Sequence, residues 1–191
     1  MNRTEKNSEI FVPYLLIAAV IVLRLTINHA WNAVPVFACL LYFAASRPRR
    51  EFAIPWLALV GVDAFLTTHT YGYGLTAGHG VTWAAYLATL MLGAGTLVNA
   101  RPVLRAPIIS LAVSAGFFVV SNFTVWLEWN MYPKTWSGLA ACYTAALPFF
   151  RNNAVAETLC AFVVFNGGRA IRQVMPALSV DRSSSTLQRE A

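Results

Sequence analysis

Charged and amide side chains lie inside otherwise apolar stretches of this sequence, at Arg24, Asp63, Asn122 and Glu157. In a lipid bilayer such groups are costly, so they normally face the interior of a helix bundle and pair with one another. Counted inward from the expected helix ends at about 1.5 Å per residue, all four lie roughly 6–9 Å deep. We therefore expect one polar cluster at this depth, with Arg24 as the counter-ion of Asp63 or Glu157. It would serve a ligand, helix packing, or both.

Polar and aromatic residues also crowd the segments that would connect helices on one side, at 28–32, 67–80 and 128–135. Because an aromatic belt would occupy both faces of a bilayer, this one-sided distribution favours a pocket. The candidate ligand contacts in and beside these segments are Asn32, His79, Trp126 and Tyr132. A plain aromatic belt with plain connecting loops is the alternative interpretation.

The composition is that of a membrane protein. Of the 191 residues, 58% are hydrophobic and 12% are charged, and that charged share is about half of what soluble domains carry. Three cysteines, Cys39, Cys142 and Cys160, disfavour a disulfide framework or a zinc site because their number is odd and their spacing irregular. The net charge of +6 comes from scattered basic residues, which disfavours nucleic-acid binding. No cofactor or metal ion is expected.

Six apolar runs predict an all-α protein with six transmembrane helices, at 11–27, 34–46, 52–68, 81–98, 107–127 and 153–166. None of them alternates apolar and polar residues as a barrel strand would. The second and sixth are shorter than the about 20 residues that a full crossing needs. Residues 136–147 predict a separate helix at the outer interface, ended by Pro148, with the last crossing starting near Arg151.

Basic residues gather on one side of the expected membrane. With six crossings that side holds Arg3, Lys6, Arg47, Arg49, Arg50, Arg101, Arg105, Arg169 and Arg172. The positive-inside rule makes it the cytoplasmic side. We expect a multi-pass protein of the inner (cytoplasmic) membrane with both termini in the cytoplasm. Its parts would be an N-terminal segment at 1–10, a single membrane domain at 11–172 and a flexible tail at 173–191.

Four stretches carry a family resemblance: LRLTINHAWNAVPVFACLLYFA at 23–44, WLALVGVDAFL at 56–66, SNFTVWL at 121–127 and YPKTWSGLAACYTAALPFFRN at 132–152. Together they resemble an uncharacterised bacterial family of six-helix transport proteins, related to the substrate-binding S components of energy-coupling-factor vitamin transporters. The resemblance implies six helices, cytoplasmic termini and a small molecule held near the outer face. The matching motif residues are Asn32, Pro35, Asp63, Asn122, Trp126, Tyr132, Pro133, Cys142, Tyr143, Pro148 and Asn152.

The same resemblance implies an energising transporter module as a partner. S components that share such a module display alanines at four-residue spacing on an early helix, whereas the first helix here offers only Ala18 and Ala19. A solitary transporter is therefore the alternative.

The favoured function is that of a membrane transporter, or its substrate-binding subunit, which captures a small molecule such as a vitamin or vitamin precursor from outside. One alternative is a structural partner subunit of a membrane complex. Another is an intramembrane enzyme with Asp63 or Glu157 as general base. The enzyme is disfavoured because no nucleophile motif accompanies either carboxylate.

Overall fold

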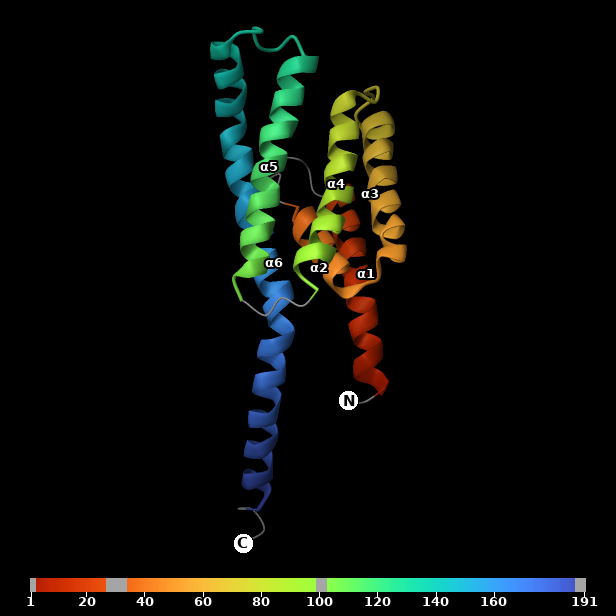
Figure 1. Cartoon of the computed structure of the whole chain (residues 1–191). Helices are drawn as coiled ribbons and strands as arrows, with labels where there is room; N and C mark the ends of the chain where they lie inside the picture. Colours follow the sequence, from red (N-terminus) through yellow and green to blue (C-terminus); the bar gives the residue numbers. More distant parts are fainter. Residues whose placement is uncertain (1–2, 27–33, 99–102, 188–191) are drawn as a thin grey trace.

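The computed structural model describes the backbone of residues 3–26, 34–98 and 103–187, and the side chains of residues 10–26, 34–98 and 103–167. Within these ranges it is all-helical (Figure 1), as the sequence predicts. The helices are α1 (Arg3–Thr26), α2 (Val36–Ser46), α3 (Ala53–Phe65), α4 (Ala77–Thr96), α5 (Arg105–Glu128) and α6 (Trp136–Leu187). A 3₁₀ turn, η1 (Arg49–Glu51), precedes α3, and a π-helical turn, η2 (Leu66–Thr70), extends it.

The helices alternate in direction along the bundle. Helix α1 begins and α6 ends at the same end, which we call the lower end and which also holds η1 (Figure 1). The opposite, upper end holds the connections from η2 to α4 and from α5 to α6. This alternation is the one expected of a chain whose two termini share one side.

Helix α2 forms the core of the bundle. It contacts α1, α4, α5 and α6, and eight of its eleven residues are buried. A helix that is apolar all round has no face that prefers water, so it packs in the centre. Helix α2 lies close to α4 at Gly93, where an added Cβ would lie 2.9 Å from the Cβ of Ala44 and 3.2 Å from the carbonyl oxygen of Leu41. The absence of a side chain at Gly93 therefore sets the spacing between α2 and α4.

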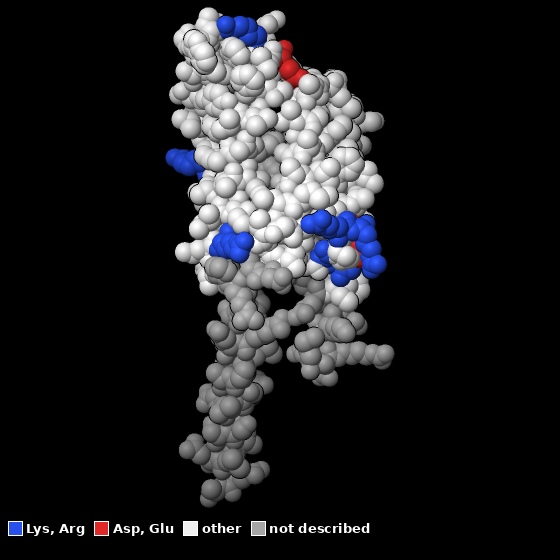
Figure 2. Space-filling view, viewed as in Figure 1, with Lys and Arg blue, Asp and Glu red and all other residues white. Residues whose placement is uncertain are grey.

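Among the described residues, two segments are long and apolar enough to cross a membrane, Arg49–Thr70 and Arg105–Glu128. Only 33% and 11% of their most apolar stretches are buried against the rest of the protein. The core helix of a soluble protein would be mostly buried. Figure 2 shows a broad, largely uncharged band on one face. Most charged side chains lie toward the two ends, and one basic side chain projects from the left edge between them.

The predicted interfacial helix at 136–147 is wrong, because α6 is one continuous helix from Trp136 that passes through Pro148. Its packing on α5 explains the continuity. The ring of Phe118 on α5 lies 5.5 Å from that of Tyr143 and 4.6 Å from that of Phe150, on either side of the proline. A neighbouring helix compensates for the hydrogen bond that a proline removes. The helix also continues to Leu187, past the expected domain boundary at 172.

Candidate functional site

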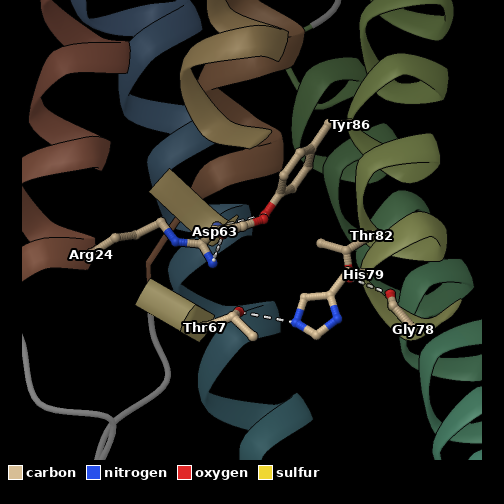
Figure 3. A network of polar contacts seen from close by, with 7 residues as sticks. All are labelled: Arg24, Asp63, Thr67, Gly78, His79, Thr82 and Tyr86. Atoms are coloured by element: carbon tan, nitrogen blue, oxygen red, sulfur yellow. Dashed lines mark hydrogen bonds and ion pairs between the residues drawn. The ribbon is translucent and has the colours of Figure 1, made fainter. Parts of the chain in front are cut away.

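Three side chains from three helices close a polar triangle. The Nη2 atom of Arg24 on α1 lies 2.5 Å from Oδ1 of Asp63 on α3. The Nη1 atom of Arg24 donates to the hydroxyl of Tyr86 on α4 at 2.5 Å, and that hydroxyl donates to Oδ2 of Asp63 at 3.0 Å. Figure 3 shows the three side chains converging. The predicted pairing of Arg24 with Asp63 is therefore confirmed.

The triangle has a buried acceptor and a more accessible donor. The side chain of Asp63 is 6% exposed, whereas that of Arg24 is 24% exposed. A guanidinium group has five N–H donors, and Arg24 uses two of its nitrogen atoms here. Both carboxylate oxygens of Asp63 already face Arg24 or Tyr86. A molecule that reached this site would meet hydrogen-bond donors of Arg24 before it met the carboxylate.

A second polar layer joins Thr67 and His79 beside the triangle (Figure 3). It lies nearer the upper end than the triangle does, because Thr67 belongs to η2 and His79 to the first turn of α4. The Nε2 atom of His79 lies 3.0 Å from the hydroxyl oxygen of Thr67. Its Nδ1 atom accepts the backbone N–H of Thr76 at 3.0 Å, which caps the first turn of α4. Because Nδ1 is the acceptor, a neutral His79 carries its proton on Nε2 and donates it to Thr67.

The π-helical turn η2 places Thr67 in this layer. The N–H of Tyr71 donates to the carbonyl of Leu66 at 2.9 Å, which is the five-residue spacing of a π-turn. The chain then reverses at Gly72, whose φ of 67° is the left-handed conformation that glycine adopts without steric cost. Such turns occur frequently at functional sites, and this one begins three residues after Asp63.

The first turn of α4 is also fixed by a carboxylate from α5. The two oxygens of Glu128 accept the backbone N–H of Gly78 at 3.1 and 3.2 Å. A negative charge is favourable at a helix N-terminus because the unpaired N–H groups point toward it. Glu128 therefore ties the upper ends of α4 and α5 together beside the site.

Glu157 makes its contacts elsewhere, so the expected four-residue cluster is wrong for this residue. Its carboxylate is fully buried and accepts the backbone N–H groups of Phe37 at 2.9 Å and Ala38 at 2.6 Å. These groups belong to the first turn of α2, which has no side-chain cap of its own. Glu157 thus caps α2, and both of its carboxylate oxygens accept backbone N–H groups.

Asn122 also lies outside the triangle. Its side-chain amide donates to the carbonyl of Phe118, one turn earlier on α5, at 2.8 Å. The thiol of Cys142 on α6 lies 3.5 Å from the backbone carbonyl oxygen of Asn122. The expectation that Asn122 joins Arg24 and Asp63 is therefore wrong, and its visible role is in helix packing.

Trp126 belongs to a structural cap at the upper end of α5. Its indole N–H donates to the carbonyl of Pro133 at 2.9 Å. The ammonium group of Lys134 lies 5.4 Å from the centre of the Trp126 ring and donates to the carbonyls of Trp126, Leu127 and Trp129. A cation at a helix C-terminus satisfies carbonyls that have no partner within the helix. Tyr132 is half-buried in the same connection, and Asn32 lies outside the described residues.

Three residues that build the site were not predicted as site residues from the sequence: Thr67, Tyr86 and Glu128. Tyr86 stands in the middle of an apolar helix, where a hydroxyl needs a partner, and this was the available signal. Thr67 and Glu128 lie at helix ends, and no pattern in the sequence relates them to residues on other helices.

The model of a family of unknown function, DUF6580, matches residues 4–178 of the chain. The match includes all three members of the triangle and all of α2 to α5. No curated protein and no solved structure matches the chain.

Proposed function

The chain belongs to this family of unknown function, and we propose that it is a multi-pass protein of the inner membrane that captures a small molecule from the outer side. It would act as a transporter or as the substrate-binding subunit of one. The four stretches resemble a family that is related to the S components of vitamin transporters, and this resemblance supports a vitamin or a vitamin precursor as the substrate class.

The exposed apolar surface supports the membrane setting. Helix α5 is 24 residues long, and only 11% of its most apolar stretch is covered by protein. Large apolar side chains such as Ile108 and Val119 are 62% and 53% exposed on it. A monomer in water rarely exposes a contiguous apolar surface of this extent. A bilayer would cover it without cost.

The proposed orientation puts the lower end in the cytoplasm. Basic side chains gather there (Figure 2), in and beside η1 and at the start of α5. They include Arg49 and Arg50, which are exposed. Under the positive-inside rule the upper end then faces outward. The triangle and the His79 layer would lie a short distance below that outer face.

The observation that carries the proposal is the Arg24–Asp63–Tyr86 triangle. An ion pair inside an apolar bundle is expensive, and well-packed apolar residues would often be at least as stable. Ionisable residues within membrane segments typically mark ligand or ion pathways. Here Arg24 also keeps donors that neither Asp63 nor Tyr86 uses. These features favour a ligand-facing role over helix packing alone.

An energising transporter module is the protein partner that this function implies. Ala18 and Ala19 are exposed on α1 and would be available to such a module. They do not repeat at four-residue spacing. A solitary transporter is therefore the alternative form of the same proposal.

Thermal unfolding tests the proposal. The purified protein would be heated in detergent with a panel of vitamins and their precursors, because a ligand that binds only the folded state raises the melting temperature. Asp63→Asn should abolish the rise for an active compound. Glu51→Gln, which alters an ion pair with Arg47 at the lower end, should retain it. Unchanged melting temperatures across the whole panel would argue against ligand capture.

A further inference from the structure

Two cysteines that are 121 positions apart in the sequence meet at the contact between α2 and α6. The Sγ atoms of Cys39 on α2 and Cys160 on α6 are 4.0 Å apart, and both thiols are free. Cys39 is 2% exposed, and Cys160 is half-buried against the main apolar core. Their spacing along the chain gives no hint of this approach.

The adjacent helical turn holds the two thiols in register. Ala38 precedes Cys39, and its N–H donates to the carboxylate of Glu157 at 2.6 Å. Glu157 lies three residues before Cys160 on α6, so the cap and the thiol pair occupy neighbouring turns of the same two helices. The hydrogen bond from Phe37 to Glu157, at 2.9 Å, adds a second constraint. The approach of the thiols is thus fixed by a polar anchor beside them.

We propose that Cys39 and Cys160 are a dithiol modification site, at which a two-electron oxidant forms a disulfide that joins α2 to α6. The sulfur atoms must approach by about 2 Å to reach bonding distance. This proposal rests on the α2–α6 contact and is independent of ligand capture.

The chemistry balances with a diazene oxidant such as diamide. The more accessible thiol of Cys160 adds across the N=N bond, giving a sulfur–nitrogen adduct. The thiolate of Cys39 then attacks the Cys160 sulfur, forms the S–S bond and displaces the nitrogen atom. The two thiol protons end on the hydrazine product, which has gained the two electrons lost by the sulfur atoms.

The third cysteine supplies an internal control. The Sγ atom of Cys142 lies near the carbonyl oxygen of Asn122 on α5 at 3.5 Å, and it is buried in the same long helix as Cys160. Cys142 should therefore stay reduced under conditions that oxidise the pair. The three thiols of one chain can be compared in a single sample.

The experiment treats native membranes with diamide, denatures the protein and alkylates the remaining thiols with N-ethylmaleimide. Mass spectrometry should find one alkylated cysteine after oxidation and three after reduction, with a peptide pair linked through Cys39 and Cys160. Cys142→Ser should still form the link, whereas Cys39→Ser and Cys160→Ser should not.

Three results would overturn the proposal. They are three alkylated cysteines in oxidised wild-type protein, a link that involves Cys142, and a covalent dimer in place of the internal link. Even if a serine variant does not fold, peptide mapping of the wild-type chain identifies which cysteines are linked. A failed search for ligands would leave this result unaffected.

Discussion

Glu157 and Phe37 form a helix cap across the bundle, in which the carboxylate on α6 accepts a backbone N–H of α2 that lies 120 positions earlier in the chain. The N–H of Ala38 completes the cap. The residue was expected to face a ligand, and its two hydrogen bonds show instead that it holds a central helix in place.

Replacing Glu157 by alanine should destabilise the protein strongly. The change leaves two buried N–H groups without a partner, which costs on the order of 3 kcal/mol in the free energy of unfolding. Denaturant unfolding in detergent measures the loss. Glu128→Ala, which removes the exposed cap of α4, should cost about 1 kcal/mol. Equal losses for the two variants would contradict the assignment of Glu157 as a buried cap.

The coupling between Arg24 and Asp63 can be measured by a double-mutant cycle. Either single alanine variant leaves an uncompensated charge in a buried site and should lower the free energy of unfolding by about 3 kcal/mol. The double variant should cost less than the sum, because both charges are then gone. The same cycle on Arg47 and Glu51, at the lower end, should give a weaker coupling. Additive losses at Arg24 and Asp63 would refute the ion pair.

Tyr86→Phe should remove two hydrogen bonds of the same triangle while it leaves the size of the side chain nearly unchanged. The hydroxyl both accepts from Arg24 and donates to Asp63. Its loss should cost about 1–2 kcal/mol in the free energy of unfolding. Tyr143→Phe is the matched control, because within the described part of the chain that hydroxyl has one hydrogen bond, to the carbonyl of Val119. A loss at Tyr86 no larger than at Tyr143 would speak against a central role for Tyr86.

Gly93→Ala should push α2 and α4 apart. The new Cβ would lie 2.9 Å from the Cβ of Ala44, and overpacking of this kind costs about 1–3 kcal/mol. At Gly95 on the same helix, no described atom outside the adjacent residues and the helix's own backbone lies within 4 Å of an added Cβ. Gly95→Ala is therefore the matched control. It should be neutral or slightly stabilising, since alanine favours helices. Comparable melting temperatures for the two variants would disprove the close approach at Gly93.

A charge on the exposed face of α5 tests the membrane setting. Val119→Arg should reduce membrane insertion, because arginine near a helix centre costs about 2.5–3.5 kcal/mol on insertion scales. The fraction of protein recovered in carbonate-washed membranes measures insertion. Val119→Leu should behave as the wild type. If the arginine variant is recovered from membranes equally well, or is more soluble in water, α5 does not face lipid.

The all-helical class could be predicted because long apolar runs without alternation of apolar and polar residues favour helices over strands. The uninterrupted course of α6 could not, since Pro148 normally signals a helix end. Its tolerance depends on ring contacts between Phe118 and residues on both sides of the proline. Such contacts between helices leave no trace in local sequence.

The candidate site was predictable in part. Depth along each helix was enough to give Arg24 a carboxylate partner, either Asp63 or Glu157, because charged groups in an apolar bundle need partners. The structure shows that the partner is Asp63. Depth alone does not say which way a side chain points around its helix. Glu157 and Asn122 lie at a similar expected depth. However, Glu157 faces α2, and Asn122 bonds to a backbone carbonyl of its own helix, α5. Rotation about the helix axis is fixed by tertiary packing, which one sequence does not reveal.

The cap on α2 constrains how the protein is made. The ribosome synthesises α2 before α6. The first turn of α2 therefore has no carboxylate cap until translation has passed Glu157. Nascent chains that stop short of this point would carry a central helix with an incomplete end. Biogenesis of the bundle is therefore completed from its C-terminal half.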